Sequence, residues 1–170
     1  PDLPHGRVRL KLFAYLDTAQ IPVQVEIGFD DDVVPAPLAM EVDTLLGQPL
    51  IIPVYAFETL VAEKLQEIVE RGTLKARMKD YCDLWSLVNA DPLDELEAAV
   101  ASTYRGRGTS IPTEVPSALT DRLATSEHAD WHWSVFLDKG KPLEKVAFAD
   151  VVAGIRERVM PVFEEIAAGR

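Results

Sequence analysis

Residues 57–88 read FETLVAEKLQEIVERGTLKARMKDYCDLWSLV, and this stretch predicts two consecutive helices. Its first half repeats apolar residues at helical spacing, namely Phe57, Leu60, Val61, Leu65 and Ile68. The spacing predicts a helix from Phe57 to about Glu70, and Gly72 is a typical C-terminal stop. The second helix is expected from about Ala76 to Val88.

Two strands are predicted upstream of these helices. Residues 7–16 alternate between the two faces of a strand, and residues 21–29 do the same after a turn at 17–20. Such alternation is typical of a half-buried strand, and two strands this close in sequence predict an antiparallel hairpin. A short edge strand is expected at residues 50–54, because an edge tolerates Pro53.

The remainder of the chain is predicted to be helical. Helices are expected at residues 93–104, 126–137 and 143–168, with a break at 105–108 and no clear period at 109–119. The last helix carries an apolar stripe formed by Phe148, Val152, Ile155, Val159 and Phe163. Strands followed by helices predict an α+β fold. We expect strands and motif helices over residues 1–90 and a helical domain over residues 91–170.

Composition limits the class of protein. The 170 residues, 48% hydrophobic and 26% charged, suit a globular protein with a sizeable core. A net charge of −11 argues against a general nucleic-acid coat, which needs clustered Lys and Arg. Cys82 is the only cysteine, and neither a membrane-spanning run nor a signal peptide is evident, so the cytoplasm is the expected compartment. Pro1 as the first residue suggests that the chain begins within a longer protein.

A lysine occupies an unusual position in the first helix. Lys64 shares a helix face with Phe57, Val61 and Ile68, whereas lysines normally lie on the wet face. Such a side chain either extends along apolar surface to reach water or faces a polar pocket. The position alone leaves both interpretations open.

The start of the second helix is also densely charged. Asp80 shares a face with Leu84, which is an inward position, and Lys79 and Asp83 have the i,i+4 spacing of an ion pair. Such clusters are often solvated surface. However, five of the 17 basic residues fall within residues 61–80, and in an acidic chain this favours an anionic ligand such as a nucleotide phosphate.

Three further places carry residue types that can bind metal ions. Glu26, on the polar face of the second strand, is either a solvent-facing carboxylate or one member of an acidic metal-binding set. Asp30–Asp32 has the composition of a turn with solvated charges. His128 and His132 have metal-ligand spacing on a helix, but no Glu lies between them as in HExxH and no third ligand is evident.

Three segments carry a resemblance to a known family. They are IPVQVEIGF at residues 21–29, YAFETLVAEKL at residues 55–65 and RMKDYCDL at residues 77–84. In this order they resemble the AbiEii/AbiGii toxin family, the nucleotidyltransferase-like toxins of bacterial abortive-infection and type IV toxin–antitoxin systems. The Arg-x-Lys-Asp-x-x-Asp-Leu element is the most specific of the three, and the strand segment is the least specific.

The resemblance implies the remnant of a polymerase-β-like mixed sheet followed by a helical region. It implies a nucleoside triphosphate held with Mg²⁺, for which Glu26 would be the metal-binding strand acid. The catalytic set would be Glu26, Lys64 and Asp80, and the nucleotide-binding set Lys64, Arg77, Lys79 and Asp83. These roles are physically sensible, because nucleotidyl transfer depends on positioning and on neutralising phosphate charge.

One family element has no counterpart in the sequence. In the family, a Gly-Ser turn followed by an Asp-x-Asp pair precedes the first strand, and no such element precedes Arg7. Asp30–Asp32 does not replace it, because it follows the strand acid. We therefore expect the C-terminal portion of a nucleotidyltransferase toxin, which when complete transfers a nucleotide to RNA or protein and has a cognate antitoxin. The alternative is a non-catalytic interaction or regulatory module derived from that fold.

Overall fold

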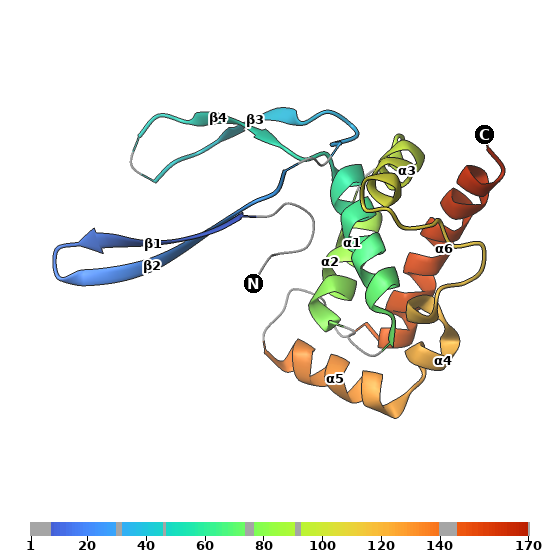
Figure 1. Ribbon diagram of the computed structural model, residues 1–170. Coiled ribbons are helices and arrows are strands. Elements are labelled where there is room, and N and C mark those ends of the chain that lie inside the picture. Colours follow the sequence, from blue (N-terminus) through green and yellow to red (C-terminus); the bar gives the residue numbers. More distant parts are fainter. Residues whose placement is uncertain are drawn as a thin grey trace. The chain divides into compact units, whose positions relative to one another are not determined.

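The computed structural model describes residues 8–29, 32–45, 47–73, 77–90, 93–139 and 146–169. The chain divides into two compact units, Pro1–Asp32 and Val33–Arg170, and each is described by itself. Strands come first and helices follow, which confirms the α+β fold (Figure 1).

The N-terminal unit contains one antiparallel hairpin. Strands β1 (Val8–Leu16) and β2 (Ala19–Ile27) pair in a register that runs from Val8 opposite Ile27 to Leu16 opposite Ala19. The turn between them uses Asp17 in a left-handed conformation (φ 53°), which aspartate tolerates better than most residues. The predicted hairpin is confirmed. The prediction that its strands are half-buried is wrong, since every residue of both strands is exposed.

The register gives this hairpin one wholly apolar face. Its residues are Val8, Leu10, Leu12, Ala14, Leu16, Ala19, Ile21, Val23, Val25 and Ile27. The opposite face pairs Arg9 with Glu26 and Lys11 with Gln24. The alternation in the sequence therefore indicated strands correctly, but it could not show whether the apolar face is covered.

A second antiparallel hairpin opens the larger unit. The expected edge strand is β4 (Leu50–Val54), and it pairs with β3 (Leu38–Val42), which the sequence pattern did not reveal. The described strands therefore form two separate two-stranded sheets, and all their pairing is antiparallel. The mixed sheet implied by the resemblance is not seen among the described residues.

The two motif helices lie close to their predicted positions. Helix α1 (Phe57–Arg71) ends at Gly72, whose positive φ of 59° explains the choice of glycine at that stop. Helix α2 (Met78–Val88) begins two residues later than expected, after Arg77 in extended conformation. Residue 76, the predicted start, lies outside the described residues.

The later helices depart more from prediction. Their bounds are α3 (Leu96–Gly106), α4 (Asp121–Ala124), α5 (Glu127–Asp138) and α6 (Phe148–Ala167), with a 3-10 turn η2 (Ser117–Leu119). Helix α3 continues through Arg105 and Gly106 and breaks only at Arg107, so the predicted break was placed too early. The region without a clear period contains η2, while α4, directly after it, was not predicted because four residues show no periodicity. Helix α6 begins later than expected, at Phe148.

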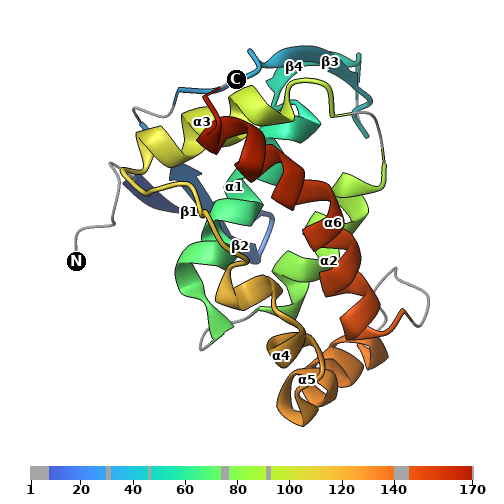
Figure 2. The ribbon, with the colours of Figure 1, turned by 90° about the vertical axis from the view of Figure 1, so that its right-hand side faces the viewer.

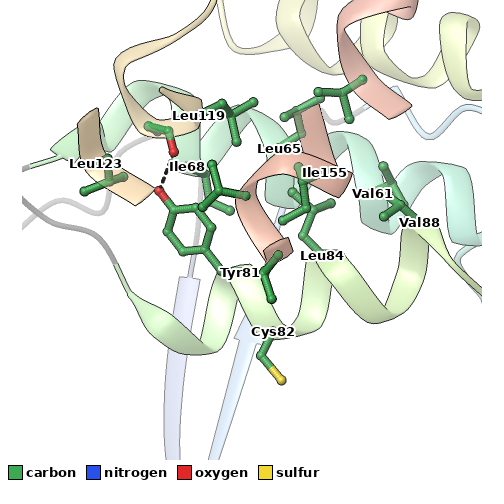
Figure 3. Packing of buried hydrophobic residues seen from close by; sticks show 14 of the residues in the cluster. Val61, Leu65, Ile68, Tyr81, Cys82, Leu84, Val88, Leu119, Leu123 and Ile155 are labelled. Carbon is green, nitrogen blue, oxygen red and sulfur yellow. Dashed lines mark hydrogen bonds between the residues drawn. The ribbon is translucent and has the colours of Figure 1, made fainter. Parts of the chain in front are cut away.

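A single apolar core joins these helices. Helices α1, α2, α3 and α6 lie side by side (Figures 1 and 2), and the stripe of α6 from Phe148 to Phe163 is fully buried, as predicted. Figure 3 shows Leu65 and Ile68 of α1 packed with Tyr81 of α2. The Tyr81 hydroxyl donates a hydrogen bond to the carbonyl of Ala118 at 2.9 Å, which connects α2 to the η2 segment.

Two features bear on the predicted domain organisation. The core draws on helices from both sides of residues 89–92, from α1 to α6. The division at residue 90 stays a prediction, and residues 91 and 92 lie outside the described residues.

Within the described ranges, no helix is both long and apolar enough to cross a membrane.

Candidate functional site: a charged cluster between the first two helices

Lys64 and Asp80 meet at the boundary between α1 and α2. The Lys64 ammonium donates to Asp80 Oδ1 at 3.0 Å. The Asp80 side chain is only 6% exposed, and that of Lys64 is 29% exposed. The inward position predicted for Asp80 is therefore confirmed, and Lys64 neither lies in apolar surroundings nor points freely into water. It is held by a buried carboxylate.

Arg71 binds the second oxygen of Asp80. Its guanidinium lies 3.1 Å from Asp80 Oδ2, and it also contacts Glu67 at 3.4 Å. A buried carboxylate is costly unless its oxygens are paired, and here both are paired with cations. Arg71 is one of the five basic residues within residues 61–80, and no specific role was predicted for it. A specific signal was available, because Arg71 lies seven residues after Lys64 and therefore near the same face of α1.

Asp83 lies at the more open side of the cluster. Its Oδ2 atom is 3.4 Å from the Lys64 ammonium and also accepts a short hydrogen bond from Lys79. The Asp83 side chain is 30% exposed and that of Lys79 is 63% exposed. The predicted i,i+4 ion pair is thus confirmed, and it is linked to Lys64 through one shared oxygen.

The environment of Lys64 affects its protonation. Partial burial acts to lower the pKa of the ammonium, because burial disfavours the charged form. The hydrogen bond and charge of Asp80, together with Asp83, outweigh that effect and raise the pKa above its usual value of 10.5. Lys64 is therefore a permanent cation at neutral pH, suited to neutralising an anion and unsuited to accepting a proton.

Arg77 stands beside this cluster in sequence but does not take part in its ion pairs. It is exposed and precedes the first turn of α2, where its carbonyl accepts from the backbone N–H of Asp80 at 2.9 Å. A side chain at this place can reach an anion near the helix N-terminus. Its predicted contact with nucleotide stays a prediction.

Glu26 belongs to the other compact unit. Its Oε1 atom accepts from Arg9 Nε at 2.8 Å and from Gln24 Nε2 at 2.9 Å, on the polar face of the β1–β2 hairpin. The predicted convergence of Glu26 with Lys64 and Asp80 concerns two separate units and stays a prediction.

The carboxylates of the described residues decide whether this part of the chain could hold a magnesium ion by itself. Mg²⁺ requires several oxygen ligands in near-octahedral geometry. Within the described ranges, no group of three or more His, Cys, Asp or Glu side chains could hold a metal ion. Asp80 and Asp83 are bound to cations, and Glu26 is bound to Arg9. These three carboxylates therefore do not form a magnesium site by themselves. The rings of His128 and His132 meet edge to face, with centroids 4.4 Å apart.

A cavity lies beside α1 and the end of α3. It has a volume of about 370 Å³ and is lined by Gln66, Val69, Glu70, Tyr104, Gly108, Thr109 and Ser110. The buried hydroxyl of Tyr104 has no hydrogen-bond partner among the described residues. The cavity shares no lining residue with the charged cluster, so sequence and structure give it no role in the predicted chemistry.

The fold and the cluster define an α+β protein whose charged site is built by the first two helices of an apolar core. A family model described as "Nucleotidyl transferase AbiEii toxin, Type IV TA system" matches residues 3–165. The chain therefore belongs to this family of nucleotidyltransferase toxins of type IV toxin–antitoxin systems, as its motifs suggested. No curated protein and no solved structure gives a significant match.

Proposed function

We propose that the α1–α2 cluster forms the phosphate-binding side of a nucleotidyltransferase site. Lys64 and Lys79 would neutralise the triphosphate of a nucleoside triphosphate, and Arg77 would contact it from the start of α2. Asp80 and Arg71 would hold Lys64 in place. The observation that carries the proposal is Lys64, whose side chain is 29% exposed and whose ammonium is held at 3.0 Å by a buried carboxylate. A fixed cation at a solvent boundary loses little entropy when it binds an anion.

The reaction would be nucleotidyl transfer in the cytoplasm. An acceptor hydroxyl of RNA or protein loses its proton to solvent and attacks the α-phosphorus, the bond to the oxygen that bridges the α- and β-phosphates breaks, and diphosphate leaves. Negative charge accumulates on the leaving diphosphate, and nearby cations stabilise it. Nucleotidyltransferases generally bind a divalent metal ion, which supplies further charge neutralisation. The metal ligand predicted in this chain is Glu26, which would hold Mg²⁺ together with the carboxylates of a Gly-Ser…Asp-x-Asp element such as the family carries.

The alternative is a non-catalytic interaction or regulatory module. One observation favours it: the cluster contains as many carboxylates (Glu67, Asp80, Asp83) as cations (Lys64, Arg71, Lys79), and they neutralise one another. A balanced cluster needs no ligand. Binding measurements separate the two functions.

The experiment combines binding and transfer. Isothermal titration with ATP, GTP, CTP and UTP at low salt should show weak binding that decreases with added salt. Lys64→Gln should weaken it, whereas Lys139→Gln, which removes the same charge from an exposed helix end, should not. Incubation with labelled nucleotide and RNA or protein acceptors tests transfer, which we do not expect from this chain alone. Absent binding, or equal binding by both variants, would support the interaction module.

A further inference from the structure

Asp83 occupies a place that suits an anionic oxygen of a ligand. Its Oδ2 atom bridges two ammonium groups, Lys64 at 3.4 Å and Lys79 in a shorter contact. These are the two lysines that the proposed function assigns to phosphate. A phosphate oxygen that contacted both lysines would lie where Asp83 Oδ2 now lies.

The two aspartates of the cluster differ in how firmly they are held. The Asp80 side chain is 6% exposed, and its two oxygens bind different cations, so it is enclosed by α1 and α2. The Asp83 side chain is 30% exposed, and its contacts go to lysines through one oxygen. A carboxylate–lysine pair that is partly open to water contributes less net free energy than an enclosed pair, because water replaces the lost contact. Asp83 can therefore turn into solvent at a smaller cost than Asp80.

We propose that Asp83 is a displaceable counter-ion that holds the phosphate subsite between Lys64 and Lys79, and that a polyphosphate binds by displacing it. This inference rests on the proposed function. Asp83 then contributes to nucleotide binding indirectly. A direct contact is unfavourable, because a carboxylate and a phosphate at neutral pH carry charge of the same sign. In the resting chain, Asp83 keeps the two lysines close together and paired.

An internal counter-ion lowers the apparent affinity of the ligand it opposes. Only the fraction of molecules in which Asp83 has left the lysines is competent to bind. The apparent Kd equals the intrinsic Kd divided by this fraction, so the apparent Kd rises as the fraction falls. Asp80 has a different role in this arrangement. It keeps the Lys64 ammonium at the site whether Asp83 is present or displaced, so that the subsite retains its shape when a ligand enters.

The test uses inorganic tripolyphosphate as the probe and calorimetry at low salt as the readout. Asp83→Asn removes the competing charge and keeps the side-chain size. Relative to the natural chain, it should tighten tripolyphosphate binding by about fivefold, since an exposed ion pair is worth up to about 1 kcal/mol. The matched control is Asp121→Asn, which removes the same charge from a carboxylate paired with Arg156, outside the cluster. It should change the affinity by less than about twofold. Thermal melts should show that both variants are folded.

The possible outcomes separate the two proposals. Tighter binding by Asp83→Asn alone, lost again when Lys64→Gln is added, supports the inference. Equal affinity of the natural chain and both variants overturns it, but leaves phosphate binding intact. If neither the natural chain nor Asp83→Asn binds tripolyphosphate, both the inference and the proposed function are wrong. Weaker binding by Asp83→Asn would show that Asp83 orders the lysines without competing for them, which also overturns the inference.

Discussion

Removal of the Asp80 carboxylate should destabilise the chain far more than removal of an exposed carboxylate. Asp80 binds Lys64 at 3.0 Å and Arg71 at 3.1 Å, and its side chain is 6% exposed. Asp80→Ala would leave two cations without their shared partner. Breaking a buried ion pair typically costs about 3–5 kcal/mol. Both cations are partly exposed and regain some water, so we expect a loss of about 3 kcal/mol.

Asp121 provides the matched comparison. It also pairs with an arginine, Arg156, at 2.7 Å, but its side chain is 80% exposed. Asp121→Ala should therefore cost less than about 1 kcal/mol. The two substitutions delete the same atoms and break ion pairs of similar length, so the difference between them measures the effect of burial.

Urea titrations followed by circular dichroism give both free energies of unfolding. Asp80→Ala should also lower the melting temperature by roughly 10 °C, against a few degrees at most for Asp121→Ala. Equal losses for the two variants, or a loss below about 1 kcal/mol for Asp80→Ala, would refute the reasoning. The Asp80 carboxylate would then not be the buried anchor of the cluster.

Three further predictions concern the core. Tyr81→Phe should lower the free energy of unfolding by about 1–2 kcal/mol, because it leaves the Ala118 carbonyl without its donor. Tyr104→Phe should be neutral or stabilising, because the Tyr104 hydroxyl has no partner among the described residues. Chemical denaturation measures both effects. Gly154→Ala should lower the free energy of unfolding by about 1–3 kcal/mol, since a Cβ there would meet Trp85 Cζ3 at 2.1 Å. Gly106→Ala should stabilise slightly, because a Cβ at that position meets nothing within 4 Å. Equal melting temperatures for the two variants would contradict this reasoning. Burial raises the pKa of Tyr81 above 10.0, and the carboxylates raise that of Lys64 above 10.5, so the folded chain holds both protons more tightly than the unfolded chain. Their contribution to stability is complete below about pH 10 and is lost as the pH rises further. The free energy of unfolding, measured from about pH 8 to about pH 11, should therefore decline at the high end, and the decline should be shallower in Tyr81→Phe.

The sequence was most informative where a charged residue broke an apolar pattern. Lys64 on the apolar face of α1 and Asp80 on the inward face of α2 were singled out for their positions, and the structure brings the two side chains into contact. Arg71 could have been found by the same reasoning, because it follows Lys64 on one helix face and lies in the last turn, where a cation is favoured. It was missed because a terminal arginine is usually a solvated surface residue.

The sequence was less informative where structure depends on distant contacts. Strand β3 has only five residues, and only its pairing with β4 defines it. The break after α3 was predicted over residues 105–108, which contain two glycines. Gly106, however, remains helical, and the chain turns at Gly108, whose φ is 63°. Periodicity cannot distinguish a glycine within a helix from one that ends it, because the difference lies in the backbone angle.

The β1–β2 hairpin determines what can be concluded about Glu26. An isolated two-stranded hairpin is marginally stable in water, and its apolar face stabilises it only when covered. Glu26 lies on the opposite, polar face beside Arg9, so covering the apolar face leaves Glu26 open to solvent. Access therefore does not limit metal binding at Glu26, whereas competition from the Arg9 guanidinium does. If Glu26 is a metal ligand, its carboxylate must exchange a cationic side chain for a metal ion, as the proposed lysines must exchange Asp83 for phosphate.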